Sequence, residues 1–515
     1  MKKILPPLSL TLTLLLTLTL PLFLLLPSCK GPEGKPGTTT PESLGVSSEA
    51  ILNFIEAAEK NRTDDLHSFI LLRHGKIAAQ GWWDPYNPES PHMLYSLSKS
   101  FTSTAIGMAQ SEGLLNINDK VISFFPEETP VNPSQNLQSM RISDLLRMNT
   151  GHNEDATGRM TKDTTNWVKA FLALDVEHKP GTRFVYNSAG TFMLSAIIQK
   201  VSGQTLLEYL TPRLFEPLGV ENPSWETAPG GISVGGWGLK VRTQDIASFG
   251  QLYIQKGMWE GKQLVPEAWV DEATKLQTSN GSDPESDWDQ GYGYQFWRCR
   301  HNLYRGDGAF GQYCIVFPEQ DAVLAITSGT SDMGAIMNLV WDHLLPAMKE
   351  KPLDENRDAF NKLQGKLSSL SLSLVKGEPD SPLAENISEQ VYTIKPNKEG
   401  VTEIVLHMKS DIQSISFAMG EKSLDIPIGF GTFRNAGITM PSGTEEAVAS
   451  SAGWISPDTL KVRSYLYETP FYHTYTIVFK GNKVSMIKKV NVGFGPDLSN
   501  EIIGIKKKIT LGKDT

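Results

Sequence analysis

The chain has 515 residues, a length that favours two or three domains over one compact core. Its composition, 40% hydrophobic and 20% charged residues, is that of an ordinary globular protein. A formal net charge of -9 argues against the broad cationic surface with which nucleic-acid-binding proteins neutralise phosphates. We therefore expect a folded protein that has no nucleic-acid partner.

The first 28 residues have the pattern of an export signal. A short positive start, Met1 to Lys3, precedes an almost continuous run of Leu and Thr from Leu8 to Leu26. The next residues, "PSC", complete a stretch that resembles the lipobox of bacterial lipoproteins, which implies lipid attachment at Cys29. We expect an exported protein held to the cell envelope by this lipid, on the periplasmic or cell-surface face. A transmembrane anchor is the alternative, because the apolar run approaches the length that spans a bilayer.

The rest of the chain divides by composition into four parts. Residues 29–46 are rich in Gly, Pro and Thr, which is typical of a flexible tether. Residues 47–350 mix strand and helix patterns and are predicted to form the first folded domain. A polar, partly helical connector is expected at 351–389. Residues 390–515 alternate in polarity with period two, which predicts an all-β domain.

Within the first domain, two apolar runs on either side of His74 and Gly75 predict a β-hairpin. Residues 96–214 then have helical patterns, including one helix with Ser143 as its N-cap and another that ends at a glycine. Strand patterns return afterwards, and an amphipathic helix follows them. The predicted strands are "GWGLKVR" (236–242), "GYGYQFWRCR" (291–300), "GQYCIVFP" (311–318) and "AVLAITSG" (322–329), and the helix spans 333–348.

These patterns predict an α+β fold: an antiparallel sheet flanked by helices, with an all-helical insertion and a C-terminal all-β domain. Cys299 and Cys314 are expected to be buried thiols, although an exported compartment would also permit a disulfide between them. The nine histidines show neither an HExxH motif nor a paired metal-ligand spacing. The sequence therefore predicts no metal site.

The pair Ser96 and Lys99 has the spacing of a reactive S-x-x-K site. The same spacing recurs at Ser373–Lys376 and Ser485–Lys488, but only Ser96 follows a predicted strand and turn and opens a helix. A helix N-terminus favours an oxyanion through its unpaired N–H groups and its dipole. Residues three apart share a helix face, so Lys99 can approach the Ser96 hydroxyl and activate it as a nucleophile.

Four ordered blocks of sequence resemble the serine β-lactamase and penicillin-binding protein superfamily, specifically its class C and esterase branch. The similarity extends from about Leu44 to Met348. The resemblance implies a β-lactamase/transpeptidase-like fold and acyl transfer without a cofactor. It assigns the nucleophile to Ser96, the lysine partner to Lys99 and the general base to Tyr186. The blocks are "YSLSKSFTSTAIG", "EGLLNINDKV", "ISDLLRMNTG" and "FVYNSAGTFMLSAIIQKVSG".

The third motif of that superfamily aligns with residues 306–308 in "YRGDGAFGQY". This alignment implies an oxyanion hole formed by the backbone N–H groups of Ser96 and Ala309. It also implies that Gly308, which has no side chain, lets the substrate approach the strand closely.

Two departures from the superfamily bear on the substrate. Ser188 stands near the position where β-lactamases commonly have the Asn of Tyr-x-Asn, and Asp307 stands where they have a cation. Asp307 would repel the carboxylate of a penicillin, although Arg305 offers a compensating charge. We therefore predict Ser188, Asp307 and Gly308 as substrate-binding positions and do not expect efficient β-lactam hydrolysis. The form "GDGAFGQ" is more similar to esterases and 6-aminohexanoate-dimer hydrolases.

A rival serine, Ser233, lies in "GISVG", which fits the G-x-S-x-G nucleophile elbow of α/β-hydrolases. That elbow requires a hydrophobic strand before it and a helix directly after it, and neither pattern is present. We therefore do not expect Ser233 to be the nucleophile. Several aromatic residues lie in segments expected to border the cleft, although packing is the commoner role for each alone. They are Trp237, Trp288, Tyr292, Tyr294 and Trp297.

Together these patterns predict an exported serine hydrolase that cleaves a small ester, amide or peptide through an acyl-enzyme on Ser96. The alternative is a cell-envelope binding protein or receptor that uses the same cleft without turnover. The combination of serine, lysine and tyrosine favours the enzyme, because a binding cleft does not need all three groups.

Overall fold

The computed structural model describes residues 39–60, 65–495, 499 and 501–507. The predicted signal peptide and the predicted lipid-attachment residue Cys29 lie outside these residues. In the part of the chain that is described, no helix has both the length and the apolarity needed to cross a bilayer. The contacts within the chain group the described residues into one compact unit.

The end of the predicted tether already contacts the folded domain. Val46 is fully buried and forms a β-bridge with Met348. Four residues earlier, in the 3₁₀ turn η1 (Glu42–Leu44), the carboxylate of Glu42 accepts a hydrogen bond from the N–H of Ser48 at 2.8 Å. Ordered contacts therefore begin a few residues before residue 47.

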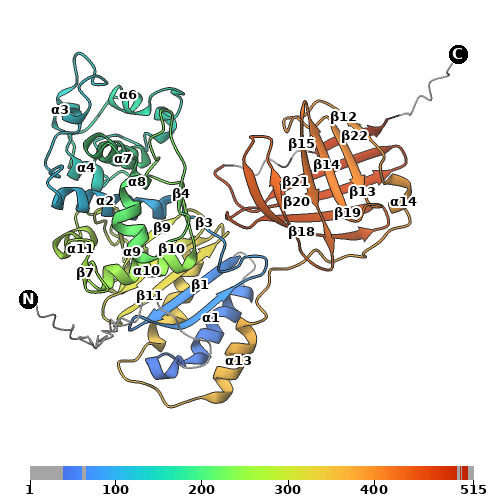
Figure 1. The fold of residues 1–515 in the computed structure, drawn as a ribbon, viewed down its shortest axis with the longest axis horizontal. Helices are drawn as coiled ribbons and strands as arrows, with labels where there is room; N and C mark the ends of the chain where they lie inside the picture. The colour runs from blue at the N-terminus through green and yellow to red at the C-terminus, as the bar shows by residue number, and fades with distance from the viewer. Residues whose placement is uncertain (1–38, 61–64, 496–498, 500, 508–515) are drawn as a thin grey trace, which may run out of the picture. The chain divides into compact units, whose positions relative to one another are not determined.

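The first large sheet is antiparallel, and helices cover both of its faces (Figure 1). Strand β1, which is second from one edge of this sheet, is buried along its whole length because alternate residues face two different cores, with Ile70 on one side and Phe69 on the other. The predicted hairpin at His74 and Gly75 is confirmed by the pairing of β1 with β2. The strand order is β2 (Lys76–Trp82), β1 (Leu66–Arg73), β11 (Ala322–Ser328), β10 (Gln312–Phe317), β9 (Tyr304–Gly308) and β8 (Trp297–Arg298).

Two groups of helices cover this sheet. One face carries α10 (Thr243–Ile254), whose residues Ile246 and Phe249 share a core with Ile70. The other face carries α1 (Ser48–Lys60), which also contacts α13, and here Phe54 packs against Phe69. The predicted helix at 333–348 is present as three consecutive helical pieces. The further helices of this face are α12 (Met333–Leu339), the π-helical turn η6 (Val340–Leu344), the 3₁₀ turn η7 (Leu345–Ala347) and α13 (Arg357–Leu367).

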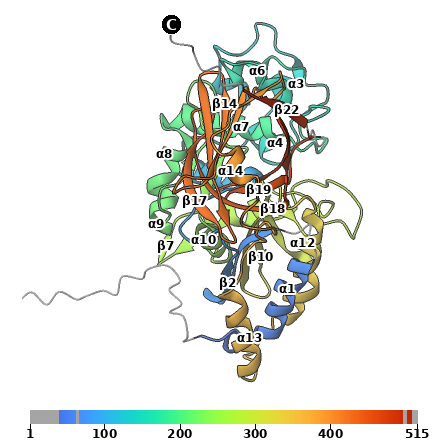
Figure 2. The same cartoon turned by 90° about the vertical axis from the view of Figure 1, so that its right-hand side faces the viewer.

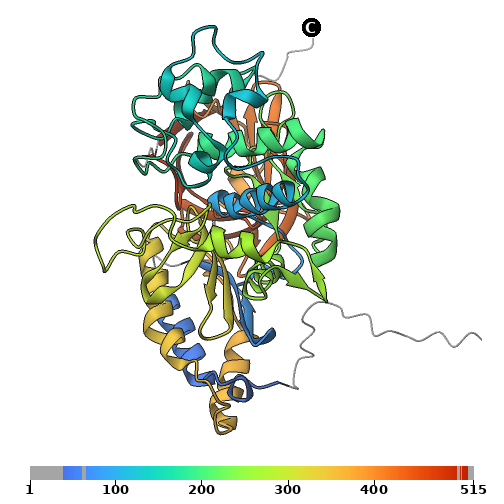
Figure 3. The ribbon, with the colours of Figure 1, turned by 90° about the vertical axis from the view of Figure 1, so that its left-hand side faces the viewer.

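The predicted all-helical insertion is confirmed, and Figure 3 shows it gathered beside the sheet. The helix that was expected to end at a glycine does so at Gly203, which has a φ of 72°. The expected N-cap at Ser143 is wrong: the cap is Arg141, because its N–H donates to the carboxylate of Asp144 at 2.9 Å. The insertion contains η2 (Tyr95–Leu97), α2 (Ser98–Ser111), η3 (Val121–Phe124), α3 (Gln135–Ser139), α4 (Ile142–Leu146), α5 (Thr157–Met160), α6 (Trp167–Leu172), α7 (Ser188–Ser202), α8 (Leu206–Leu210), η4 (Thr211–Phe215) and α9 (Glu216–Leu218).

Two predicted strands, at 236–242 and 291–300, are much shorter than expected, and only Leu239–Val241 (β5) of the first is a strand. Of residues 291–300, only β8 is a strand, because positive φ angles at Gly291 (104°) and Gln295 (65°) break the pleat. The Gln295 side chain turns into the core and donates to the carbonyl of Leu146 at 2.8 Å. The remaining short elements are β3 (His92–Met93), β4 (Ser224–Trp225), β5 (Leu239–Val241), β6 (Met258–Trp259), β7 (Lys262–Gln263), η5 (Arg300–Asn302) and α11 (Glu267–Thr274).

The predicted C-terminal all-β domain is confirmed by a second sheet, whose orange and red strands lie toward the viewer in Figure 2. Its edges meet where β15 contacts β17, so the sheet curls into a nearly closed barrel around its own core. It follows α14 (Ala384–Ile387). Its strands are β12 (Tyr392–Ile394), β13 (Glu403–His407), β14 (Ser414–Met419), β15 (Lys422–Pro427), β16 (Gly429–Phe430), β17 (Arg434–Thr439), β18 (Glu445–Ser456), β19 (Thr459–Leu466), β20 (Tyr472–Lys480), β21 (Lys483–Val490) and β22 (Glu501–Lys506).

The two cysteines are free and buried, as expected, and the alternative of a disulfide is wrong. Cys314 lies in the core shared with α10, where its thiol is 3.5 Å from the carbonyl oxygen of Ile246. Cys299 lies in the core on the opposite face of the sheet. The intervening sheet keeps the two sulfurs apart.

Candidate active site

Ser96 lies in the turn η2, between β3 and α2. The sequence predicted that Ser96 opens the helix, but the α-helix begins two residues later, at Ser98. The chain turns sharply here because Tyr95 has a left-handed backbone conformation, with a φ of 48°. This turn leaves Ser96 only partly buried, while the α2 residues that follow it are buried in the core.

The Lys99 side chain approaches Ser96 from the first turn of α2. Its Nζ is 2.9 Å from Ser96 Oγ and donates to the carbonyl oxygen of Gly236 at 2.6 Å. The side chain is buried, and this burial lowers the lysine pKa to about 7, although the carboxylates of Asp155 and Asp307 act in the opposite direction. A substantial fraction of Lys99 is therefore a neutral amine near neutral pH, able to accept a proton from Ser96.

Tyr186 completes the predicted trio from the segment just before α7. Its hydroxyl shares a hydrogen bond with Ser96, and the centre of its ring is 5.0 Å from Lys99 Nζ. The ring is stacked on Trp297 at 5.3 Å between centroids. Burial, with the nearby Asp307 carboxylate, raises the tyrosine pKa far above its ordinary value, and the hydrogen bond from Ser96 only partly offsets this. Tyr186 is therefore a neutral phenol in this site.

The residues after Tyr186 form the N-terminus of α7. Asn187 caps this helix, and its side-chain oxygen accepts from the N–H of Ala189 at 3.2 Å. Its side chain is fully buried, so its amide bonds within the protein. Ser188, predicted to bind substrate, is the first residue of the helix, and its N–H donates to Asp155 at 3.2 Å. Sequence reasoning missed Asp155, whose carboxylate also accepts from the N–H of Thr157, an Asx-turn pattern readable in "DAT".

The glycines of β9 let this strand lie directly against the turn that carries Ser96. A Cβ on Gly306 would be 2.4 Å from Leu97 Cδ1, and a Cβ on Gly308 would be 2.0 Å from the carbonyl oxygen of Leu94. Packing alone thus requires a glycine at position 308, and the close substrate approach that the sequence suggested there stays a prediction. Ala309 follows, and among the described residues its N–H has no hydrogen-bond acceptor. This amide is free to serve, with that of Ser96, as an oxyanion hole.

Asp307 is paired with Arg305 inside the protein. Arg305 Nε and Nη2 lie 3.0 and 2.8 Å from the same carboxylate oxygen, Arg305 is fully buried and Asp307 is 6% exposed. Burial raises the pKa of Asp307, and the guanidinium and the Lys99 ammonium oppose this rise. Asp307, predicted to bind substrate, therefore has its charge largely neutralised by Arg305.

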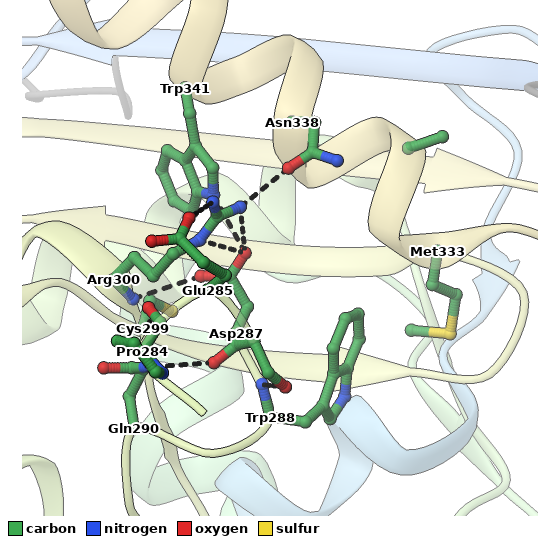
Figure 4. A network of polar contacts seen from close by, with 12 residues as sticks. Pro284, Glu285, Asp287, Trp288, Gln290, Cys299, Arg300, Met333, Asn338 and Trp341 are labelled. Carbon is green, nitrogen blue, oxygen red and sulfur yellow. Dashed lines mark hydrogen bonds and ion pairs between the residues drawn. The ribbon is translucent and has the colours of Figure 1, made fainter. Parts of the chain in front are cut away.

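Arg305 is itself held by a polar network, part of which is drawn in Figure 4. Its Nη1 donates to the carbonyl oxygen of Asp287 at 2.9 Å and to Cys299 Sγ at 3.1 Å. The Asp287 carboxylate accepts from Arg300 Nη2 and from Trp341 Nε1, each at 2.9 Å. Trp341, in η6, thus helps to hold Asp287, which in turn holds Arg305 in its pair with Asp307.

The aromatic residues predicted at the cleft have different positions. Tyr292 and Trp297 contact the Tyr186 ring, and Arg305 lies 4.8 Å from the centre of the Trp288 ring. Tyr294 instead packs in the core against Trp269, with 5.6 Å between ring centroids, which is the packing role expected as the commoner one. Trp237 packs on Trp167 at 6.1 Å.

The rival Ser233 does not occupy a nucleophile elbow, as expected. It is buried and bridges to Thr227, and its carbonyl oxygen accepts from Ser195 Oγ at 2.6 Å. The segment contributes to the site through backbone carbonyls, since Gly235 and Gly236 accept from Thr102 and Lys99. A carbonyl has no side-chain signature, so the sequence did not reveal this role of Gly236.

Side chains able to bind a metal ion are not clustered in the part of the chain that is described, where no three His, Cys, Asp or Glu residues are suitably grouped. His67 and His92 are buried with 3.1 Å between His67 Nδ1 and His92 Nε2, so these two nitrogens satisfy each other. Burial lowers the pKa of both rings.

Comparison with known proteins identifies the family. The family model described as Beta-lactamase matches residues 67–343, from the second residue of β1 to within η6. The chain belongs to the β-lactamase family. This membership agrees with the sheet, the helical insertion and the grouping of Ser96, Lys99 and Tyr186, and it confirms the resemblance and the hydrolase class inferred from the sequence.

Relatives in the β-lactamase family include the 6-aminohexanoate-dimer hydrolase of Paenarthrobacter ureafaciens, which is 25% identical over 292 residues, covering 52% of this chain and 73% of that protein. Protein flp of Staphylococcus aureus (strain MW2) is 27% identical over 172 residues, covering 31% of this chain and 34% of that protein. A solved structure, the octameric penicillin-binding protein homologue from Pyrococcus abyssi, has 19% identity and a TM-score of 0.46, covering 88% of this chain and 99% of that one.

Proposed function

We propose that this member of the β-lactamase family is an exported serine hydrolase that cleaves an ester or a linear amide through an acyl-enzyme on Ser96. The observation that carries the proposal is the 2.9 Å approach of Lys99 Nζ, an amine whose pKa is lowered to about 7 by burial, to Ser96 Oγ. A serine hydroxyl becomes a good nucleophile only when a base is this close.

In the acylation step, Ser96 Oγ attacks the substrate carbonyl carbon while its proton moves to Lys99 Nζ. The carbonyl oxygen becomes negative and accepts hydrogen bonds from the N–H groups of Ser96 and Ala309. The proton then passes through the Tyr186 hydroxyl to the leaving alkoxide or amine as the carbonyl bond to it breaks. This reassigns the general base from Tyr186 to Lys99, because the high pKa of the phenol makes a free phenolate inaccessible.

In the deacylation step, a water molecule takes the place of the leaving group. It loses its proton to Lys99 through the Tyr186 hydroxyl and attacks the ester carbonyl, and Ser96 Oγ recovers a proton as the acid product leaves. Each cycle consumes one water and regenerates the site, so no cofactor is required.

Two observations support linear substrates over β-lactams. The buried Asp307 occupies the position where a cation would bind the carboxylate of a penicillin, and its partner Arg305 is fully buried. The relative named as a 6-aminohexanoate-dimer hydrolase supports a linear amide as one substrate class. We therefore propose esters, linear amides or peptides as substrates, with weak or no hydrolysis of β-lactams.

Export and lipid anchoring at Cys29 form part of the proposal and rest on the sequence of residues 1–29. A cell-envelope location would give the enzyme small substrates of that compartment. Metabolic labelling with an alkyne fatty acid tests the anchor: label is expected on the native chain and absent from Cys29→Ala.

The proposed function is tested on protein that begins at residue 30 and so lacks the predicted signal peptide and Cys29. We expect a fluorophosphonate probe to label one serine, mapped by mass spectrometry to Ser96, and the protein to hydrolyse p-nitrophenyl esters. Labelling of Ser233 would contradict the proposal. Labelling of Ser96 without turnover of any ester, amide, D-amino-acid peptide or β-lactam in a panel would favour the binding-protein alternative.

The lowered pKa of Lys99 predicts the pH dependence of acylation. Only the neutral amine accepts the Ser96 proton, so kcat/KM should rise as the pH increases through about 7 and level off above it. Stopped-flow acylation between pH 5 and 9 measures this profile, where these pH limits are chosen to span about two pH units on each side of the pKa. A flat profile, or activity that falls as the pH rises through 7, would assign the base to another group.

A further inference from the structure

Two residues with left-handed backbones flank the proposed oxyanion hole. Tyr95, with a φ of 48°, directly precedes Ser96, and Phe310, with a φ of 67°, directly follows Ala309. Bulky non-glycine residues rarely adopt this conformation, and it persists only where the surrounding structure holds it. The directions of the Ser96 and Ala309 N–H groups therefore depend on what holds Tyr95 and Phe310.

Four aromatic rings meet at this point. The Tyr95 and Phe310 rings are edge to face, 5.4 Å apart. Phe471 contacts both, at 6.3 Å from Tyr95 and 5.6 Å from Phe310. Phe494 also contacts both, at 5.6 Å and 4.9 Å. Phe471 and Phe494 belong to the C-terminal sheet, one just before β20 and the other just after β21.

The segments that carry these two phenylalanines are fastened to the hydrolase fold. The carbonyl oxygen of Glu468, in the turn between β19 and β20, accepts from the N–H of Met93 at 2.8 Å. Asn491 Nδ2 donates to the carbonyl oxygens of Gly329 and Pro470 at 3.2 and 2.9 Å. Gly329 has no room for a side chain, since a Cβ there would be 2.4 Å from the Pro470 oxygen.

We propose that Phe471 and Phe494 are positioning residues that clamp Tyr95 and Phe310 and thereby aim the two oxyanion-hole amides. The inference rests on the proposed function of Ser96 and Ala309. Phe494 is 77% exposed, so packing in the core of its own sheet does not account for it. The clamp gives the C-terminal sheet a part in catalysis: without it, the hydrolase fold retains Ser96, Lys99 and Tyr186 but loses the support for the oxyanion hole.

The test compares Phe494→Ala and Phe471→Ala in the chain that follows Cys29, with Ile412→Ala as the control. Ile412 is a 50% exposed apolar residue between β13 and β14 of the same sheet. Each phenylalanine variant should lower kcat for p-nitrophenyl esters about tenfold, less than the loss of a whole oxyanion donor, with KM changed by less than about twofold. Phe494→Leu should restore most of kcat, and the control should match the native protein.

A second measurement separates aiming of the amides from a general loss of structure. A boronic acid that bonds to Ser96 places an oxygen in the oxyanion hole, so its inhibition constant should rise about tenfold in the same variants while the thermal midpoint moves by less than about 2 °C. An unchanged kcat would overturn the inference. If KM rises while kcat stays unchanged, the rings contact the substrate and do not position the amides. If Phe471→Ala does not fold, Phe494→Ala decides alone. Failure of the proposed function can be told apart from failure of this inference, because in that case Ser96 of the native protein would not react with the fluorophosphonate probe.

Discussion

Replacement of Ser96 by alanine is expected to lower kcat/KM for p-nitrophenyl esters on the order of 10⁴-fold or more and to abolish labelling by a fluorophosphonate. The expected loss is large because the acyl-enzyme of the proposed mechanism forms on Ser96 Oγ, which Lys99 Nζ and the Tyr186 hydroxyl both contact. The fold should be retained, since the partly buried Ser96 lies in a short turn and alanine removes only its hydroxyl oxygen.

The matched control is Ser233→Ala, at the serine of the "GISVG" pattern. Ser233 contributes its carbonyl oxygen to Ser195, and alanine keeps that carbonyl. We expect this variant to stay within about threefold of the native kcat/KM, as for a substitution outside the reacting groups. The assignment of the nucleophile fails if Ser96→Ala keeps measurable labelling or if Ser233→Ala loses activity.

Replacement of Arg305 by methionine is expected to destabilise the protein by about 3–5 kcal/mol. Arg305 is fully buried and is the ion-pair partner of Asp307, so its loss leaves a buried carboxylate without a compensating charge. The carbonyl of Asp287 and the thiol of Cys299 would lose their donor as well. Urea unfolding followed by tryptophan fluorescence measures the change in unfolding free energy.

Three further measurements test whether the loss of stability comes from the unpaired carboxylate of Asp307. Arg357→Met removes an exposed ion pair with Glu355, whose side chains are 79% and 53% exposed, and should change stability by less than about 1 kcal/mol. Asp307→Asn combined with Arg305→Met should recover part of the loss because no unpaired charge remains. The deficit of the single variant should shrink as the pH falls, since losing the guanidinium raises the pKa of Asp307 further and a protonated acid is less costly to bury. A deficit equal to that of Arg357→Met would show that the buried pair is not needed.

The local sequence pattern was sufficient to predict a helix, strand or turn wherever that element satisfies its own hydrogen bonds and buries one repeating face. The hairpin at His74 and Gly75, the helix that ends at Gly203 and the period-two strands of the C-terminal sheet all follow this rule. The sequence pattern gave the wrong element where a hydrogen bond to a distant residue replaces the local backbone hydrogen bonds. Gln295 is the clearest case, because its amide bonds to Thr191 and Leu146 across the core and bends a segment with the composition of a strand.

The sequence by itself determined the α+β class and the β-lactamase resemblance, and it proposed Ser96, Lys99 and Tyr186 as the candidate site, because these depend on residue types at short or ordered spacings. Only the tertiary structure decided that Lys99 is buried and has a lowered pKa, that Arg305 is paired with Asp307 and that Phe471 and Phe494 contact Tyr95 and Phe310. These properties depend on burial and on contacts between residues up to several hundred positions apart. Both arise only when the chain excludes water and brings distant segments together.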